Sequence, residues 1–387
     1  MSEAIDYDLH GFVGIRLLDA GAAEERLVTR QLGPIRAALA REPDVTIRFV
    51  DRLELGPLRL IGADDAAFCD EGFVLLRGKQ KSRARVLLPL DRAGDRCEIV
   101  AERGLAAVPH LVAIVNLTAL AHGVLPLHAS AFTWNGAGVL ATGWAKGGKT
   151  EALLAFLGEG AAYVGDEWIY LGGAGPRMHG IPEPIRVWDW QLREAAWLRE
   201  RLAAGPRTRL AALRGLARPL AALAGGRHAA ARFARRVRPL VEAQRWVQLA
   251  PRECFGAERC VASALPDVLF LMASHDAPEI AVRPIEPREV ARRMVASLAF
   301  ERADLVASYQ KLRFAFPEAR NRWLEGAEAR ERELLASALG TLPAFEVRHP
   351  YPVSFAALHE AMRPHCGAAL PRRSSTSSRP QRALGAE

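Results

Sequence analysis

Short hydrophobic runs separated by Gly, Pro and Asp dominate the first hundred residues. The runs with the length and composition of strands lie at 12–18, 45–50, 58–61, 72–76 and 83–88. Residues 22–40 predict one helix among them. This half carries no recognisable chemical motif, and the pattern predicts a smaller α+β N-terminal domain over residues 1–105.

The middle of the chain changes pattern. Residues 106–122 are apolar on most helical faces, which predicts a well-buried helix. The expected strands that follow lie at 129–133, 139–142, 163–164 and 168–171, with a helix at 149–157. Because Asn135-Gly136 is a hairpin signal, we expect the first two of these strands to be antiparallel neighbours.

The last two hundred residues alternate between helical and extended patterns. Residues 190–245 predict Ala/Arg/Leu-rich helices, broken at Gly205-Pro206, Pro219 and Gly225-Gly226. The further expected elements are strands within 267–285, helices over 286–340, a strand at 345–349 and a helix at 354–362. We therefore predict one domain over 106–366, with an insertion at 193–245, and a disordered Ser/Arg/Pro-rich tail at 367–387.

Composition excludes several classes of protein. Half of the 387 residues are hydrophobic, which excludes a wholly disordered chain. Five cysteines without a CxxC pair exclude a small disulfide scaffold and favour reduced thiols. The chain shows no secretory signal, and its most apolar stretch, 111–131, is interrupted by polar residues. We therefore expect a cytoplasmic protein with no membrane span.

The charge of the chain is concentrated in one segment. Residues 193–245 hold 13 Arg, three Glu and no Asp, a net charge of +10 against +8 for the whole chain. Such a segment is either a solvated helical insertion or a surface for an acidic peptide, a nucleic acid or lipid headgroups. No motif of a nucleic-acid-binding module accompanies it.

A glycine-rich loop is the most informative motif. It reads Gly143, Trp144, Ala145, Lys146, Gly147, Gly148, Lys149 and Thr150, which matches GxxxxGK[ST]. In such a loop the backbone N–H groups turn inward onto phosphate oxygens, the lysine reaches the β- and γ-phosphates, and the threonine hydroxyl reaches Mg²⁺. The alternative is a glycine-rich turn without a ligand, but the expected strand before it and helix after it favour nucleotide binding.

Three further residues could carry chemistry beside this loop. Asp166 and Glu167 follow an apolar strand, where two carboxylates could hold Mg²⁺ and accept a proton from a hydroxyl. Neighbouring strand residues point to opposite faces, so both can serve one site only where the strand ends or distorts. Otherwise they are solvated turn acids. His128 taken alone is more typical of a core histidine.

The order of these features resembles one family. His128, two strands, the loop at 143–150, a helix and two adjacent acids occur at spacings similar to those of HPr kinase/phosphorylase and its relatives. The resemblance is specific over residues 124–171 and weaker over 267–285. It implies an α/β, P-loop-containing, phosphoenolpyruvate-carboxykinase-like mixed sheet.

The resemblance also implies roles for individual residues. Gly143–Thr150 would bind the nucleotide phosphates, Asp166 would act as general base, and Glu167 would assist Thr150 in holding Mg²⁺. His128 would sit beside the transferring phosphate, and Lys149 would stabilise its charge. The family's glycine-containing signature after the acids is replaced by 178–187, which counts against HPr as substrate and against phosphorolysis. Arg186 in this stretch is either a phosphate contact or one surface arginine among many.

We therefore expect an ATP- and Mg²⁺-dependent serine kinase. The expected acceptor is a Ser/Thr hydroxyl of a peptide or protein, such as a biosynthetic precursor peptide, and acidic peptides are candidates because of the basic segment. The alternatives are a kinase for a small-molecule hydroxyl and a non-catalytic nucleotide-sensing module. A homo-oligomer is compatible with the sequence.

Overall fold

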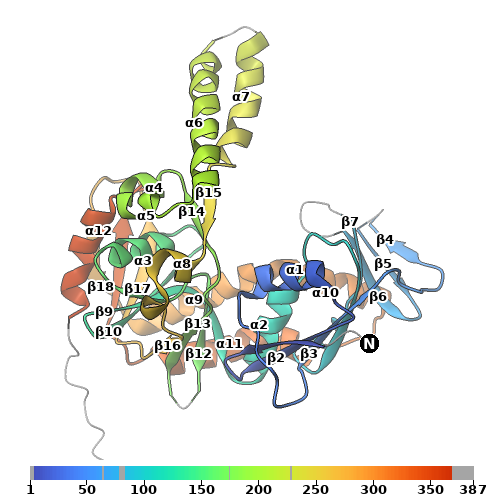
Figure 1. Cartoon of the computed structure of the whole chain (residues 1–387). Helices are drawn as coiled ribbons and strands as arrows, with labels where there is room; N and C mark the ends of the chain where they lie inside the picture. Colours follow the sequence, from blue (N-terminus) through green and yellow to red (C-terminus); the bar gives the residue numbers. More distant parts are fainter. Residues whose placement is uncertain (1–3, 63–64, 78–82, 174, 227–228, 368–387) are drawn as a thin grey trace, which may run out of the picture.

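The computed structural model describes residues 4–62, 65–77, 83–173, 175–226 and 229–367. Two large mixed β-sheets, each accompanied by helices, form the body of the protein, and a helical hairpin projects from it (Figure 1). The chain is therefore a mixed α/β protein. The predicted tail lies almost entirely outside the described residues.

The N-terminal sheet has eight strands in the order β1-β2-β3-β8-β7-β6-β5-β4. Its strands are β1 (Ile5–Leu9), β2 (Val13–Leu18), β3 (Val45–Val50), β4 (Arg59–Ile61), β5 (Ala66–Cys69), β6 (Gly72–Arg77), β7 (Arg83–Leu87) and β8 (Cys97–Glu102). Strand β3 is parallel to both β2 and β8, and the other neighbours are antiparallel. Val45, Ile47 and Phe49 alternate with partly exposed residues, so one face of β3 is buried.

The sequence located most of this sheet but not all of it. The five predicted strands correspond to β2, β3, β4, β6 and β7, whereas β1, β5 and β8 were not predicted. The helix predicted over 22–40 is α1 (Ala22–Leu32), so its predicted end is wrong. The helix ends at Gly33, which has a φ of 77°, and Pro34 follows. A left-handed glycine followed by a proline is a strong helix terminator.

The second sheet has nine strands and contains the glycine-rich loop. The strands lie in the order β16-β13-β12-β9-β10-β17-β19-β18, and β11 pairs with β9 outside this path. They are β9 (Leu125–Trp134), β10 (Ala137–Gly143), β11 (Ala162–Gly165), β12 (Trp168–Gly172), β13 (Arg177–Gly180), β16 (Ser263–Ala264), β17 (Val268–Ser274), β18 (Ala281–Pro284) and β19 (Ala344–His349). β9 and β10 are antiparallel neighbours, as the Asn-Gly turn predicts, while β10, β17 and β19 are parallel.

Helices cover both faces of this sheet. α3 (Lys149–Gly158) and α12 (Phe355–Met362) pack in one buried cluster, and α9 (Pro287–Glu301) and α11 (Arg322–Leu339) pack in another. A third cluster joins the N-terminal sheet to α2 (Leu111–Ala121), α10 (Ala303–Ala315) and α11. The N-terminal sheet therefore shares its core with helices from the second half of the chain, and the boundary predicted at residue 105 stays a prediction.

The basic segment forms the helical hairpin. It contains α6 (Ala204–Ala224) and α7 (Ala229–Glu242), and it rises from a two-stranded sheet of β14 (Ile185–Trp188) and β15 (Trp246–Leu249). Gly225 ends α6 as predicted, but the predicted breaks at Gly205-Pro206 and Pro219 are wrong. Gly205-Pro206 lies in the first turn of α6, where proline is tolerated, whereas Pro219 lies inside the helix, which continues to Ala224 although proline offers no backbone N–H there.

The short helices α4 (Gln191–Glu194), α5 (Ala196–Glu200) and α8 (Pro251–Phe255) flank the base of the hairpin. All five cysteines are free. Among the described residues, no helix combines the length and hydrophobicity needed to cross a membrane.

Candidate functional site: a glycine-rich loop beside two carboxylates

The glycine-rich loop connects the end of β10 to the start of α3, as the sequence predicts. Gly143 has a φ of 149°, and a Cβ there would lie 2.4 Å from the Met272 carbonyl oxygen on β17. Gly148 has a φ of 107°, and a Cβ there would lie 2.1 Å from Nε2 of His349. Both positions therefore require glycine, because the backbone is left-handed and the neighbouring strands leave no space.

The loop closes around the side chain of Lys149. Its Nζ lies 3.0 Å from the carbonyl oxygen of Trp144 and 3.4 Å from that of Gly143, and the residue is 6% exposed. Burial lowers the pKa of Lys149, while the charges of Asp166 and Glu167 oppose that shift. A buried ammonium whose hydrogen-bond acceptors among the described residues are carbonyl oxygens suits a phosphate ligand, because an anion completes its donor set.

The backbone after β11 brings both predicted acids to this loop. The strand ends at Gly165, and Glu167 has a left-handed backbone with a φ of 67°. Because the strand ends here and the backbone turns, Asp166 and Glu167 need not point to opposite faces of a strand, so both can serve one site. Asp166 points to Thr150, whose hydroxyl donates to Oδ2 at 3.0 Å, and to Ser130, whose hydroxyl donates to Oδ1.

Asp166 and Glu167 have opposite environments. Asp166 is 3% exposed, and its burial and the charge of Glu167 raise its pKa from 3.8 to about 6. The Glu167 side chain is 61% exposed. Its contact with His128 lowers its pKa, and the charges of Lys149 and Arg186 lower it further. Asp166 is therefore the carboxylate whose pKa lies closer to neutral pH.

His128 lies between two carboxylates. Its Nε2 is 3.2 Å from Glu167, and its Nδ1 is 2.9 Å from Glu301 at the end of α9, although that second contact is not aligned as a hydrogen bond. The ring also packs on Trp168, with centroids 5.8 Å apart. Burial lowers the pKa of His128, but the two carboxylates outweigh it and the net shift is upward. His128 is thus a residue of the site that contacts two carboxylates, and not a histidine enclosed by apolar side chains.

The remaining predicted residues lie at the rim. Trp144 is 51% exposed, and its ring centroid is 4.9 Å from that of Phe300. Lys146 is exposed and has a φ of 62°. Arg186 is exposed on β14, with its guanidinium 4.6 Å from the Trp246 ring centroid, and its charge acts on Glu167. No hydrogen bond links it to the loop among the described residues.

Four residues of the site were not predicted from the sequence. Ser130 lies two positions after His128 on β9, so the strand alternation could have indicated it. Glu301, His349 and Glu183 gave no local signal, because distant segments bring them here. His349 is fully buried, with Nε2 2.9 Å from the Gly147 carbonyl oxygen.

Glu183 adds a third carboxyl group, whose pKa is shifted by Asp166 and Glu167. Its Oε1 is buried and has no hydrogen-bond partner among the described residues. Burial, followed by the charges of Glu167 and Asp166, raises its pKa well above the usual value. The proton on Glu183 is therefore favoured by its burial and by the charges of Glu167 and Asp166.

The donor set fits Mg²⁺ bound together with phosphates. Within the described part of the chain, no group of three or more His, Cys, Asp or Glu side chains is arranged to hold a metal ion. Mg²⁺ does not need such a group, because it is commonly held by one or two protein oxygens, waters and substrate phosphates. The Thr150 hydroxyl, Asp166 and Glu167 are the oxygens available for it.

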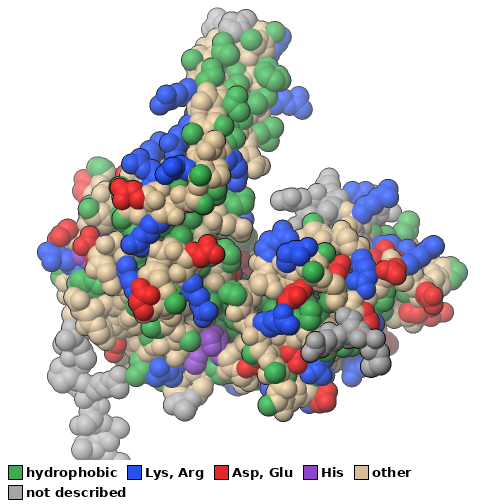
Figure 2. All heavy atoms as spheres, in the orientation of Figure 1, with side chains coloured by type: hydrophobic (Ala, Val, Ile, Leu, Met, Phe, Trp, Pro, Cys, Tyr) green, Lys and Arg blue, Asp and Glu red, His purple; other side chains and the backbone are tan. Residues whose placement is uncertain are grey.

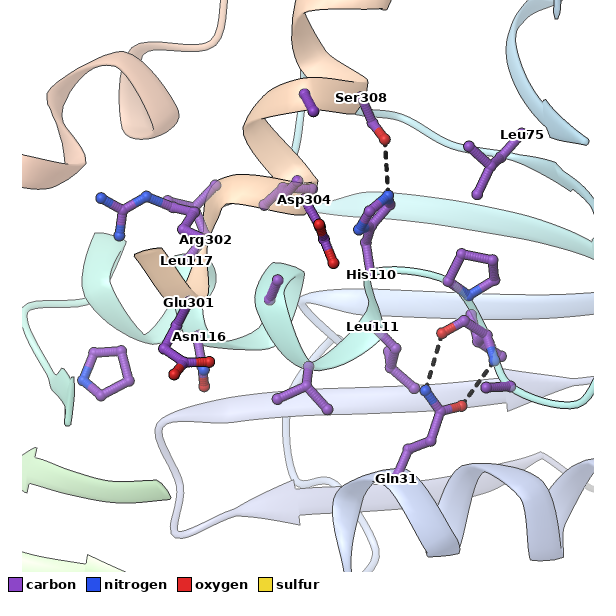
Figure 3. Close-up of a pocket in the computed structure, with 18 of the residues that line it drawn as sticks. Gln31, Leu75, His110, Leu111, Asn116, Leu117, Glu301, Arg302, Asp304 and Ser308 are labelled. Carbon is purple, nitrogen blue, oxygen red and sulfur yellow. Dashed lines mark hydrogen bonds between the residues drawn. The ribbon is translucent and has the colours of Figure 1, made fainter. Parts of the chain in front are cut away.

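A cavity of about 740 Å³ adjoins the site between the N-terminal sheet, α2 and α10 (Figure 3). Its wall includes Glu301 and Trp168, which both contact His128, and a 2.9 Å hydrogen bond between His110 and Ser308. Among the described lining residues there is none from 143–150, nor either adjacent acid. A ligand in this cavity would therefore touch the site only through the partners of His128.

Comparisons with known proteins add no family to this picture. No protein-family model matches the chain, and no curated protein matches it.

Proposed function

We propose that this protein is an ATP-dependent kinase of the HPr-kinase-like type, with a phosphoenolpyruvate-carboxykinase-like P-loop fold. Its acceptor would be a Ser or Thr hydroxyl of a peptide or protein. The observation that carries the proposal is the meeting of the glycine loop with Asp166, whose carboxylate lies 3.0 Å from the hydroxyl of Thr150. A nucleotide-binding loop joined to a buried carboxylate of raised pKa supports phosphoryl transfer more than storage of a nucleotide.

Each residue of the site has one role in the proposed phosphoryl transfer. Mg-ATP, when bound, supplies the phosphoryl group and neutralises part of its charge. Lys149 and the loop amides hold the phosphates in place. Asp166 removes the proton from the acceptor hydroxyl while the hydroxyl oxygen bonds to the γ-phosphorus. The bond between the γ-phosphorus and the oxygen that bridges to the β-phosphate breaks, and ADP is released. Thr150 and Glu167 would hold the metal ion, and His128 would keep Glu167 oriented.

Three observations bear on this division between the acids. The raised pKa of Asp166 favours it as the base, because a base titrating near neutral pH transfers protons best. The exposure of Glu167 and the hydrogen bond from Thr150 to Asp166 favour the reverse arrangement, with Asp166 on the metal. Magnesium titrations separate them, since the variant of the metal-binding acid requires more Mg²⁺ for its remaining activity.

The first test is nucleotide binding. Mg-ATP at a hundredfold excess over Kd should stabilise the protein by about 2.7 kcal/mol, seen as a higher Tm. Lys149→Ala should remove most of that shift, whereas Arg288→Ala, which removes an exposed cation from α9, should leave it unchanged. An equal shift in the Lys149 variant would exclude the phosphate-loop assignment.

The second test is transfer of labelled γ-phosphate to peptides and to small hydroxyl compounds. Labelled peptide in the wild type and its loss in Asp166→Asn support the kinase. Transfer to small hydroxyl compounds alone would favour the small-molecule alternative. Nucleotide binding without transfer to any hydroxyl acceptor would favour a nucleotide-sensing module.

A further inference from the structure

The cavity of about 740 Å³ beside the candidate site has walls from distant parts of the chain (Figure 3). The end of α1, strand β6 and α2 supply one part of the wall, and the end of α9 with α10 supplies another. Apolar side chains, among them Leu111, Leu117 and Leu305, face it alongside several polar ones. A cavity of this volume with apolar walls and a few polar groups is typical of a site for a small organic molecule.

The cations in the wall of the cavity already have partners. Lys311 of α10 forms an ion pair with Asp65, and Arg302 donates to both carboxylate oxygens of the buried Glu331. Arg77 of β6 is not free either. Among its described residues, the wall therefore offers no spare positive charge to an anionic ligand.

Two carboxylates in the wall have acceptor capacity left. Asp304, in the first turn of α10, is exposed and has no hydrogen bond or ion pair within the described part of the chain. Glu301 uses Oε1 for its contact with His128, and its Oε2 has no partner among the same residues. The contact with His128 lowers the pKa of Glu301, which keeps this carboxylate ionised at neutral pH.

Glu301 and Asp304 face the same part of the cavity. They are three residues apart, and Arg302 between them keeps a right-handed helical backbone, so both lie on one side of the helical path. Figure 3 shows both carboxylates pointing from this segment toward α2. On the surface of the N-terminal part, by contrast, acidic and basic side chains are interspersed (Figure 2). The two carboxylates, with one histidine as their shared partner, are therefore a local excess of negative charge.

A buried amide group also lines this cavity. Asn116 on α2 is 8% exposed, and its Oδ1 accepts a hydrogen bond of 2.8 Å from the hydroxyl of Tyr170. Its Nδ2 has no acceptor among the residues that the structure describes. Leaving a buried donor without an acceptor costs free energy, so Asn116 indicates, independently of the acids, that a polar group enters the cavity.

We propose that this cavity binds a small organic amine, with its ammonium group at Glu301 and Asp304 and its body against the apolar walls. An ammonium group supplies three donors to the free carboxylate oxygens and brings the charge that the wall lacks. An anion would meet two carboxylates without a free cation, and an uncharged ligand would leave both carboxylates without a counter-charge. An oxygen on the body would accept the hydrogen bond from Asn116. The site needs no nucleotide, so it does not rest on the proposed function.

Binding is measured by isothermal titration of the full-length protein, without nucleotide, with three compounds that share a hydroxyphenyl body. They are tyramine, which carries an ammonium group, 4-ethylphenol, which carries no charge, and 3-(4-hydroxyphenyl)propionate, which carries a carboxylate. We expect tyramine to bind one-to-one with a Kd about tenfold or more below that of 4-ethylphenol, and the propionate to bind most weakly. Added salt should weaken the binding of tyramine but not that of 4-ethylphenol, because only the ionic contact is screened.

The charge of the site is tested at Asp304, because Glu301 also contacts His128 of the candidate site. Asp304→Asn should weaken the binding of tyramine about tenfold or more and change that of 4-ethylphenol less than twofold, since it removes a charge and keeps the shape. The matched control is Asp276→Asn, which alters an exposed acid outside the wall and should leave both Kd values within twofold.

The place of binding is tested by filling the cavity. Ala307→Trp puts a large ring at an exposed position of α10 that lines the cavity, so it should weaken the binding of both tyramine and 4-ethylphenol. Gln310→Trp alters an exposed position of the same helix outside the wall and should leave both unchanged. Melting curves confirm that each variant is folded.

Several outcomes overturn the inference. Without saturable binding of tyramine to the wild type, the cavity is a hydrated gap whose polar groups are satisfied by water. Equal affinities for tyramine and the propionate refute the assignment to an amine, and so does an unchanged Kd for tyramine in Asp304→Asn. Binding that Ala307→Trp leaves intact takes place elsewhere on the protein and refutes the site.

Discussion

Replacing Asp166 by asparagine should slow phosphoryl transfer strongly and, at neutral pH, stabilise the fold. The carboxyl group is 3% exposed, and its pKa is about 6 in the folded protein against 3.8 for an unperturbed aspartate. Between these values the folded protein binds more protons than the unfolded chain. Stability therefore falls as pH rises from about 4 to about 6, because the ionised group is better solvated in the unfolded chain.

The size of the effect follows from the shift. A rise of about two pKa units corresponds to roughly 3 kcal/mol of lost stability above pH 6. Asparagine keeps the shape and one oxygen, which can accept from Ser130 and, at the 3.3 Å that Thr150 already has to Oδ1, from Thr150; its NH2 group replaces Oδ2, and it carries no charge. Asp166→Asn should thus recover up to roughly 3 kcal/mol at pH 7.5 and almost nothing at pH 4. Its transfer rate should fall by about 10²–10⁴.

The assay is a series of melting curves from pH 4 to pH 7.5, with transfer of labelled phosphate measured on the same samples. Glu167→Gln is the matched control. Contact with His128 lowers the pKa of Glu167, so its ionised form stabilises the fold above the usual pKa, and that stability is lost as pH falls. This variant should melt slightly lower at pH 7.5, because the side chain is largely exposed. An Asp166→Asn protein that melts below the wild type at pH 7.5 would refute the reasoning.

Three further changes follow from the site and the helical hairpin of α6 and α7. Gly148→Ala should abolish most of the stabilisation by Mg-ATP, because the added Cβ meets His349. The double variant Gly148→Ala/His349→Ala should recover only part of it, because the left-handed φ still costs about 1–2 kcal/mol. Isothermal titration measures the Mg-ATP affinity of both variants. His128→Ala should slow transfer while changing Tm little, because the ring pairs with carboxylates; a large loss of Tm with transfer intact would make it a structural residue. Asp189→Ala should lower the free energy of local unfolding of the α6–α7 hairpin by up to about 3 kcal/mol, because it leaves Arg214 unpaired. Hydrogen exchange should therefore rise in α6 and α7 but not in α3.

The glycine-rich loop of the candidate site could be predicted from the sequence alone. The loop between β10 and α3 spans only eight residues, and its glycines set the backbone conformation just before the helix that begins at Lys149. The order of these residues along the chain is therefore enough to predict the loop. The Asn-Gly turn likewise predicts the antiparallel pair of β9 and β10. These features depend on neighbours in the chain, and the structure has them where the pattern predicts them.

Partners from distant segments could not be predicted in this way. Glu301 reaches His128 from the end of α9, and His349 supports the loop from β19, about two hundred residues away. Nothing in the residues around Glu301 or His349 distinguishes them from other acids and histidines. Only the pairing of β17 with β19 and the packing of α9 on the sheet bring them to the site.

The helical hairpin of α6 and α7 likewise has features that the sequence predicts and others that only the tertiary structure decides. Composition alone located the basic segment and its helices, and Gly225 marked the end of the first one. Whether Ala231 and Ala234 or Phe233 and Leu240 would face the partner helix was decided by packing, because α7 could bury either set. The small residues permit close contact of the two helices, which leaves the large ones in solvent. Sequence periodicity gives the two faces of a helix, but only the tertiary contacts determine which face is left without a partner.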